Sequence, residues 1–333
     1  MQDLTIIGLG ISAQTLIDKL KAEGFSQSLT AIDKDEFYFS RPGLISAPAD
    51  ISKRIELSSW ARERGINFIN DKVERVNPKR KKVYLKNSEI IEYKKLIIAT
   101  GLKSKKHPAK GDHREGFFYL SALNPFKLKD LVRISKEAVV DVSTFLGIKL
   151  AVSLNNLGLE VRVTCRNLDF LSVYKEKLLN YFDHSQIAIN FNTEIDEAVG
   201  ESTVKAVKVN PLKVFSSQML FLDSGFSPAA DFFEEEVYVS DCFFSNYEDL
   251  YFLADAGNSA SEGESFFINN YSDCCQQALI FSEFLLKGRR PDFSRTALNE
   301  DDIEKAVNAC FKDIKKNDSF DSVGENIEEV RNG

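Results

Sequence analysis

The amino-acid sequence of 333 residues has little of the chemistry that carries most metal and thiol sites. It contains three histidines and five cysteines, and no two of the cysteines are spaced as C-x-x-C. This scarcity argues against an ordinary zinc site or a redox dithiol, so we expect no metal site. Cys274 and Cys275 are adjacent, which is poor geometry for a disulfide. We interpret both as small buried residues of a helix.

Long apolar runs and an excess of basic residues are also missing. No stretch approaches the ~20 consecutive apolar residues that span a bilayer. The N-terminus lacks the basic start and the small-residue cleavage site of a signal peptide. The formal net charge of -7 gives no global support for binding to nucleic acid. We therefore expect a cytoplasmic protein that has neither a membrane nor a nucleic-acid partner.

Apolar runs of strand length alternate with segments of helical periodicity along most of the chain. This alternation predicts an α/β fold with parallel sheets. The polar and charged stretch 318–333 is predicted to be flexible. The predicted strands are 4–7, 29–33, 82–85, 95–99, 138–142, 160–164, 187–191, 204–209, 218–222 and 250–253, and the predicted helices are 11–23, 145–157, 273–286 and 303–314.

A glycine-rich turn follows the first predicted strand. Gly8, Gly10 and Ala13 fit the pattern G-x-G-x-x-G/A. In that pattern the first glycine allows a tight turn, the second lets a pyrophosphate approach the backbone, and the third position packs helix against strand. Asp33 ends the next strand, where an acid can accept hydrogen bonds from an adenosine ribose. The turn therefore predicts a dinucleotide site, although a tight turn without a ligand would show the same glycines.

Four stretches of the chain, in the right order, carry a family resemblance. They are the N-terminal strand–turn–helix–strand, FYFSRPGL at 37–44, LIIATG at 96–101 and LYFLADA at 250–256. Together they resemble the FAD-dependent pyridine nucleotide-disulfide oxidoreductase superfamily, in particular its rubredoxin, ferredoxin and nitrite reductase branch. In the last stretch Ala254 replaces the glycine of the family's Gly-Asp pair, whereas Asp255 is retained.

The resemblance implies two Rossmann-like dinucleotide-binding domains, with the second inserted in the first. Residues 1–115 and 241–300 would form the FAD-binding domain, 116–240 a degenerate NAD(P)H-binding domain, and 301–333 a helical extension with a flexible tail. The resemblance assigns no catalytic residue. The residues that it assigns to FAD are Gly8, Gly10, Ile11, Ser12, Ala13, Asp33, Lys34, Arg41, Pro42, Val73, Ala99, Thr100, Gly101 and Asp255.

The second glycine-rich turn departs from the pattern. At 142–147 the first two glycine positions are Val142 and Thr144, and only Gly147 is kept. A β-branched residue at the second position places side-chain atoms where a pyrophosphate must approach, and it fits poorly if the turn needs a positive φ. The following strand ends in Cys165 and Arg166 instead of an acid. We therefore expect NAD(P)H binding to be impaired, although Arg166 suits a 2′-phosphate.

Lys149 stands where members of this branch often carry a glutamate. A cation there would stabilise a reduced, anionic flavin. The other interpretation is a solvated lysine on a helix of a domain that no longer binds a nucleotide.

Three functional hypotheses follow. The leading one is an FAD-binding oxidoreductase that takes electrons from a small-molecule substrate or a redox protein partner. The second is a non-catalytic partner subunit or scaffold that keeps FAD or another nucleotide as a structural ligand. The third is an ordinary NAD(P)H-dependent reductase whose second turn tolerates these replacements.

Overall fold

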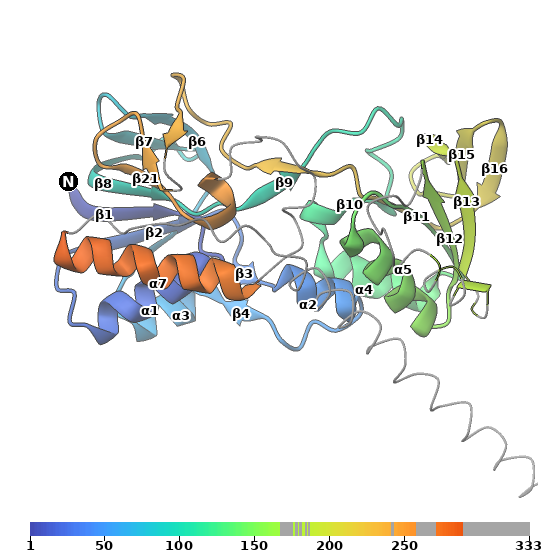
Figure 1. Ribbon diagram of the computed structural model, residues 1–333, viewed down its shortest axis with the longest axis horizontal. Helices are drawn as coiled ribbons and strands as arrows, with labels where there is room; N and C mark the ends of the chain where they lie inside the picture. Colours follow the sequence, from blue (N-terminus) through green and yellow to red (C-terminus); the bar gives the residue numbers. More distant parts are fainter. Residues whose placement is uncertain are drawn as a thin grey trace, which may run out of the picture.

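The computed structural model describes residues 1–166, 187–240, 243–257 and 271–288, together with residues 176, 179, 182, 183 and 185. These residues form two lobes along the long axis of the molecule, each built on a sheet with a parallel centre (Figure 1). The predicted α/β class with parallel sheets is therefore confirmed. In this part of the chain no helix is both long and apolar enough to cross a membrane.

The first sheet is centred on β1 (Gln2–Ile7). The five central strands follow the order β21-β8-β1-β2-β5, and each is parallel to its neighbours. A late strand of the chain thus pairs with an early one. These strands are β2 (Leu29–Asp33), β5 (Asn67–Asn70), β8 (Ile90–Ile98) and β21 (Leu250–Phe252), and β6 (Val73–Asn77), β7 (Lys82–Leu85), β19 (Val239–Ser240) and β20 (Phe244–Ser245) attach to them in antiparallel fashion.

Both faces of this sheet are covered, which explains why β1 is buried from Leu4 to Ile7. One face packs against α1 (Ile11–Ala22), α3 (Leu57–Glu63) and α7 (Tyr271–Lys287), and these three helices lie on the same side in Figure 1. The predicted periodicity of α1 is confirmed, because Ala13, Leu16, Ile17 and Leu20 are all buried. The other face packs against the β6–β7 hairpin.

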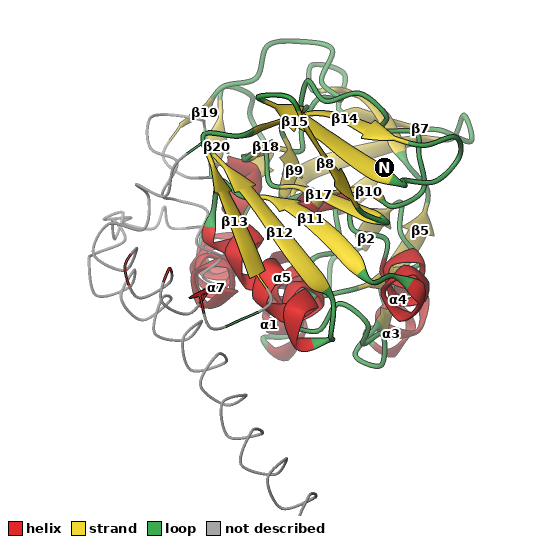
Figure 2. Cartoon of the chain, turned by 90° about the vertical axis from the view of Figure 1, so that its right-hand side faces the viewer, coloured by secondary structure: helices red, strands yellow, loops and turns green. Residues whose placement is uncertain are grey.

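The second sheet has five strands, all parallel, in the order β10-β17-β11-β12-β13. The connection from β11 to β12 runs through α5 (Phe145–Asn156), as the helical periodicity of 145–157 predicts. Figure 2 shows this sheet with α4 (Pro125–Ile134) and α5 below it. The strands are β10 (Phe117–Tyr119), β11 (Glu137–Asp141), β12 (Glu160–Cys165), β13 (Ile187–Phe191) and β17 (Met219–Leu222).

A three-stranded antiparallel sheet covers the opposite face of the second sheet. It consists of β14 (Glu194–Val199), β15 (Ala206–Asn210) and β16 (Lys213–Ser216). Its apolar side chains share a core cluster with Val139, Leu220 and Leu222. The predicted strand 204–209 begins later, at Ala206, and the sequence patterns did not indicate its partners β14 and β16.

Short elements join the two lobes. They are β3 (Phe37–Tyr38) with β4 (Ile55–Glu56), β9 (Leu102–Ser104) with β18 (Phe226–Pro228), α2 (Arg41–Ser46), and the 3₁₀ turns η1 (Leu120–Ala122) and η3 (Ala254–Gly257). The domain boundaries stay a prediction. The predicted helix 303–314 and the tail to 333 lie outside the described residues.

The expected burial of two adjacent cysteines is wrong. Cys274 and Cys275 are both half-buried. They lie on the first turns of α7, where Thr15 of α1 donates a hydrogen bond to the Cys275 Sγ at 3.4 Å.

Candidate functional site

The predicted site residues come together at the carboxyl-terminal edge of the first sheet. Parallel strands end at one edge, and ligands of open α/β sheets bind there. The turn after β1, the end of β2, the turn after β8 and the turn after β21 all meet at this edge. Segments far apart in the sequence are thus brought side by side by strand order alone.

Gly8 forms the contact between two of these turns. Its φ is +92°, and a Cβ added to it would lie 2.6 Å from the backbone oxygen of Ala99 and 2.8 Å from the Thr100 Cα. Its amide donates to the Ile32 carbonyl oxygen at 2.8 Å. Only glycine fits this conformation and this approach.

Gly10, unlike Gly8, has open space around its Cα. It is the N-cap residue of α1, with φ -73° and ψ -174°, a conformation open to any residue. A Cβ added to it would meet no described atom within 4 Å. A helix leaves the N–H groups of its first turn without intrahelical partners, and no described side chain caps those of α1. The helix start at Gly10, Ile11 and Ser12 is therefore suited to an anion.

Thr100 presents a polar group to this edge. Its Oγ1 is buried and has no hydrogen-bond partner among the described residues. A buried hydroxyl without a partner is costly, and such a group commonly awaits a ligand or a water. Because Thr100 packs against Gly8, this hydroxyl belongs to the same site as the glycine-rich turn.

Asp33 ends β2 and braces the glycine-rich turn. Its Oδ2 accepts a hydrogen bond from the Leu9 amide at 2.6 Å, and its Oδ1 accepts one from the Asp35 amide at 3.0 Å. Burial raises the pKa of the carboxyl group above its usual value, and these two amides oppose the shift. Each carboxylate oxygen keeps a further lone pair, so the residue can still accept from a ligand hydroxyl.

Arg41 joins this edge to the second lobe. The Ser40 side chain caps α2, and Arg41 begins that helix. The guanidinium donates to the Leu102 carbonyl oxygen at 3.1 Å and lies 5.6 Å from the centroid of the Phe226 ring. Burial raises the pKa of Asp255, whereas the nearby charge of Arg41 lowers it. The charge of Arg41 thus acts on Asp255 next to the turn after β21, and both residues are half-buried.

Ala254 explains how this turn survives the loss of the family's glycine. Its φ is +52°, so alanine adopts the left-handed conformation that glycine would adopt without strain. The backbone path of the turn is retained at an energetic cost.

Ala254→Gly is therefore expected to stabilise the protein by ~0.5–1 kcal/mol, since the left-handed strain of alanine exceeds the added unfolded-state entropy of glycine. Urea denaturation of the flavin-free protein measures this. Ala256→Gly is the matched control, because Ala256 lies in the same turn without a positive φ, and this variant should be destabilised. Equal destabilisation by both changes would contradict the account.

The other predicted residues lie nearby with less distinctive contacts. Ala13 is fully buried on α1 and Pro42 follows Arg41 on α2. Gly101 has φ +65° in the turn after β8. The charge of Lys34 acts on Asp33. Val73 begins β6 and packs in the core with Ile7 and Ile32, so its role toward a cofactor stays a prediction.

The second turn has a different backbone from the first. Thr144 is the N-cap of α5, as Gly10 is of α1, with φ -138° and ψ 170°. Neither Val142 nor Thr144 has a positive φ, so the replacements cause no backbone strain there. The Thr144 Oγ1 accepts a hydrogen bond from the Leu146 amide at 3.2 Å. This helix start is capped by the protein itself.

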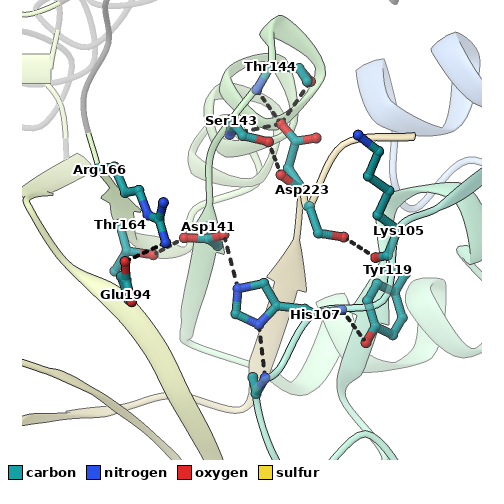
Figure 3. A network of polar contacts seen from close by, with 12 residues as sticks. Lys105, His107, Tyr119, Asp141, Ser143, Thr144, Thr164, Arg166, Glu194 and Asp223 are labelled. Atoms are coloured by element: carbon teal, nitrogen blue, oxygen red, sulfur yellow. Dashed lines mark hydrogen bonds and ion pairs between the residues drawn. The ribbon is translucent and has the colours of Figure 1, made fainter. Parts of the chain in front are cut away.

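Asp223, which follows β17, completes that cap and was not foreseen from the sequence. Its Oδ2 accepts from the Ser143 amide at 3.2 Å, from the Thr144 amide at 2.6 Å and from the Thr144 hydroxyl at 2.7 Å (Figure 3). The Ser143 hydroxyl donates to the Asp223 carbonyl oxygen. The side chain is fully buried, and its Oδ1 has no partner among the described residues. In the sequence it lies two residues before Gly225, and no local pattern marks it as a cap.

A second acid, Asp141, ends β11 beside this cap. Its Oδ1 accepts from the Thr164 hydroxyl at 3.1 Å, and its Oδ2 lies 4.0 Å from the His107 Nε2. Burial, with a smaller contribution from the charge of Asp223, raises the pKa of Asp141 to about 7. Burial also lowers the pKa of His107, which favours its neutral form.

The end of β12 carries Cys165 and Arg166 at the place where an acid would accept from a nucleotide ribose. Cys165 is buried, and the Arg166 guanidinium pairs with Glu194 at 2.6 Å. Lys149 is half-buried on α5. Among the described residues, no three histidine, cysteine, aspartate or glutamate side chains gather in a way that could hold a metal ion.

Two strand–turn–helix units, each on its own parallel sheet, define a two-domain protein of the dinucleotide-binding class. The family model of the pyridine nucleotide-disulphide oxidoreductases matches residues 2–240, and the chain belongs to this family. Members of the family are FAD-dependent oxidoreductases. The resemblance read from the sequence is thereby confirmed.

Named relatives agree with this assignment. The chain is 25% identical to human apoptosis-inducing factor 3 over 245 residues, which is 70% of this chain and 40% of that protein. It is 21% identical to the ferredoxin–NAD(+) reductase subunit of the benzene 1,2-dioxygenase system of Pseudomonas putida over 238 residues, which is 68% of this chain and 58% of the subunit. The chain thus spans less than two thirds of the length of these relatives.

Solved structures share the fold. A ferredoxin reductase from Rhodopseudomonas palustris superposes with a TM-score of 0.72 at 15% identity, covering 87% of this chain and 78% of its own. An NAD-dependent persulfide reductase from A. fulgidus gives a TM-score of 0.73 at 17% identity, with 92% and 66% covered. The predicted fold of two Rossmann-like domains is confirmed.

Proposed function

We propose that this protein binds FAD at the edge of the first sheet and works as a flavin-dependent oxidoreductase with impaired NAD(P)H binding. The observation that carries the proposal is the contrast between the two helix starts. The start of α1 is uncapped and has open space over Gly10, whereas the start of α5 is capped by Thr144 and Asp223. Only the first is suited to a dinucleotide pyrophosphate.

The residues of the first edge fit the parts of FAD. The first amides of α1 would hold the pyrophosphate, with Ala13 allowing close packing, and Asp33 would accept from the adenosine ribose beside Lys34 and Val73. The Thr100 hydroxyl, between Ala99 and Gly101, would gain the partner that it lacks within the described residues. Arg41, next to Pro42, and Asp255 would orient the flavin end. FAD supplies the two-electron chemistry when bound.

The impaired step is the entry of electrons from a nicotinamide. Thr144 at the second glycine position carries its methyl and hydroxyl groups at the helix start. The acid for the ribose of NAD(H) is replaced by Cys165 at the end of β12, and Arg166, which could accommodate a 2′-phosphate, pairs with Glu194. We infer that a small-molecule substrate or a redox protein partner reduces the flavin instead. Two relatives named as ferredoxin reductases favour a protein partner.

Anaerobic titration of the purified protein tests both parts of this proposal. The protein should be yellow, dithionite should bleach its flavin spectrum, and stoichiometric NADH or NADPH should not. A colourless protein that FAD does not reconstitute would contradict cofactor binding. Rapid bleaching by NADH would instead contradict only the impaired binding of NAD(P)H. If dithionite alone reduces the flavin and no candidate donor does, a structural role for FAD is favoured over catalysis.

A further inference from the structure

The carboxylate of Asp223 occupies the position that a dinucleotide phosphate takes in an intact turn of this kind. A phosphate at such a site accepts hydrogen bonds from the amides of the turn and of the helix start. Here the Asp223 Oδ2 accepts from two successive amides, those of Ser143 and Thr144. The Gly147 amide points to the same carboxylate. One side-chain oxygen thus takes the donors that an anionic ligand would need (Figure 3).

Gly147 shows how closely the carboxylate is fitted. A Cβ added to Gly147 would lie 2.7 Å from the Asp223 Oδ2 and 3.1 Å from the Val142 Cγ2. The third position of the glycine pattern ordinarily allows helix and strand to pack closely. In this chain the same small residue makes room for the carboxylate of Asp223. The side chain is fully buried, so it does not share the position with a ligand.

A second acidic side chain lies next to Asp223. Asp141 ends the neighbouring strand, and the charge of Asp223 contributes to the raised pKa of Asp141. Arg166, one cation of this region, pairs with Glu194, and burial lowers the pKa of His107. A pyrophosphate approaching this turn would meet the Asp223 side chain where an intact site offers free amides and a glycine backbone.

We propose that Asp223 is an internal substitute for the nucleotide phosphate and that this residue, rather than the lost glycines, excludes NAD(P)H from the second domain. The proposal rests on the proposed function and deepens it by naming the residue that sets the ligand specificity. Two explanations for the loss of NAD(P)H binding can then be told apart. In one, Val142 and Thr144 spoil the turn; in the other, Asp223, which lies 79 residues from Thr144, fills the site.

The test is the binding of ADP-ribose and NADH by calorimetry to the FAD-loaded protein and its variants. The wild type is expected to bind neither probe at about 1 mM, a concentration at which weak binding is measurable. Asp223→Ala, with near-native circular dichroism and flavin content, should gain affinity for both probes by about tenfold or more, as the freed amides become available.

Two further variants cover a folding failure of Asp223→Ala and the alternative that the lost glycine is the barrier. Asp223→Ser retains one hydroxyl acceptor for the helix start and should show the same gain if Asp223→Ala does not fold. Thr144→Gly restores the second glycine with Asp223 in place, and it should still bind neither probe.

The failures are distinguishable. If the wild type already binds NADH tightly, the impaired binding stated under the proposed function is wrong, and the role of Asp223 falls with it. If the wild type does not bind but folded Asp223→Ala and Asp223→Ser do not bind either, only the role of Asp223 is wrong. Binding gained by Thr144→Gly alone would also overturn it, because the lost glycine would then be the barrier.

Discussion

Replacing Gly10 by valine is expected to abolish FAD binding while the protein stays folded. The position has an extended backbone that valine adopts readily, and an added Cβ meets no described atom within 4 Å. In the complex, however, that space is the approach of the pyrophosphate to the amides of α1. We expect a loss of at least about 100-fold in FAD affinity, which corresponds to roughly 3 kcal/mol. Flavin fluorescence titration of the apoprotein measures it.

The alanine variant adds a single methyl group at the N-cap of α1. Gly10→Ala should change the stability of the apoprotein by less than about 1 kcal/mol, because the smaller conformational freedom of alanine in the unfolded chain is offset by its poorer fit at an N-cap. The same methyl group should weaken FAD binding. Denaturation of the apoprotein and titration with FAD separate the two effects.

Gly8→Ala is the matched control. A Cβ at Gly8 would lie 2.6 Å from a backbone oxygen in a residue with φ +92°, so this variant should lose on the order of 3 kcal/mol of folding stability or more. A Gly10→Val protein that unfolds as readily as Gly8→Ala would contradict the assignment of Gly10 to the ligand.

The difference between these two glycines marks what the sequence could predict about the site. Local patterns were sufficient for the turn itself, because strand, glycines, helix and terminal acid are consecutive in the chain. They were also sufficient for the amphipathic face of α1. The distinct reasons for Gly8 and Gly10 could not be read locally, since the first depends on Ala99 and Thr100, which β8 brings alongside β1.

The second turn shows the same limit more strongly. The replacements at Val142 and Thr144 were evident in the sequence, but the positive φ considered for this turn is not adopted. Thr144 acts as a helix cap in an extended conformation. The residue that fills the turn, Asp223, is distant in sequence, and it becomes a neighbour only because β17 pairs with β11.

The antiparallel strands β14 and β16 were missed for another reason. Their patterns are polar or irregular, with one buried residue in β16 and a register shift in β14. Alternation is too weak to identify such strands when they are only partly buried. Their packing against the second sheet, which the sequence does not encode locally, is what holds them.

The second large effect concerns Asp141, whose burial couples folding stability to pH. Its pKa is raised from 3.8 to about 7 by loss of solvation, with Asp223 adding to the shift, while the Thr164 hydroxyl and Arg166 oppose it. Between these two pH values the folded state holds a proton that the unfolded state releases. The contribution of Asp141 is therefore fully present below about pH 4 and is lost as the pH rises through 7. Roughly three pH units correspond to about 4 kcal/mol.

Asp141→Asn is expected to remove this dependence, since asparagine has the same shape, still accepts from Thr164 and carries no charge. Between pH 5 and pH 8 the variant should gain about 3 kcal/mol of stability relative to the wild type, because roughly two of the three pH units of the shift lie above pH 5. Urea denaturation at both values measures the difference. Asp3→Asn is the control with the opposite sign, because hydrogen bonds from Lys94 and Ser28 lower the pKa of Asp3 to about 2, so its removal should destabilise the protein at pH 8. The stability difference between Asp141→Asn and wild type could instead stay the same from pH 5 to pH 8. Asp141 would then carry its charge in the folded protein at both pH values, and the carboxylates at this sheet edge would be solvated more fully than their burial implies.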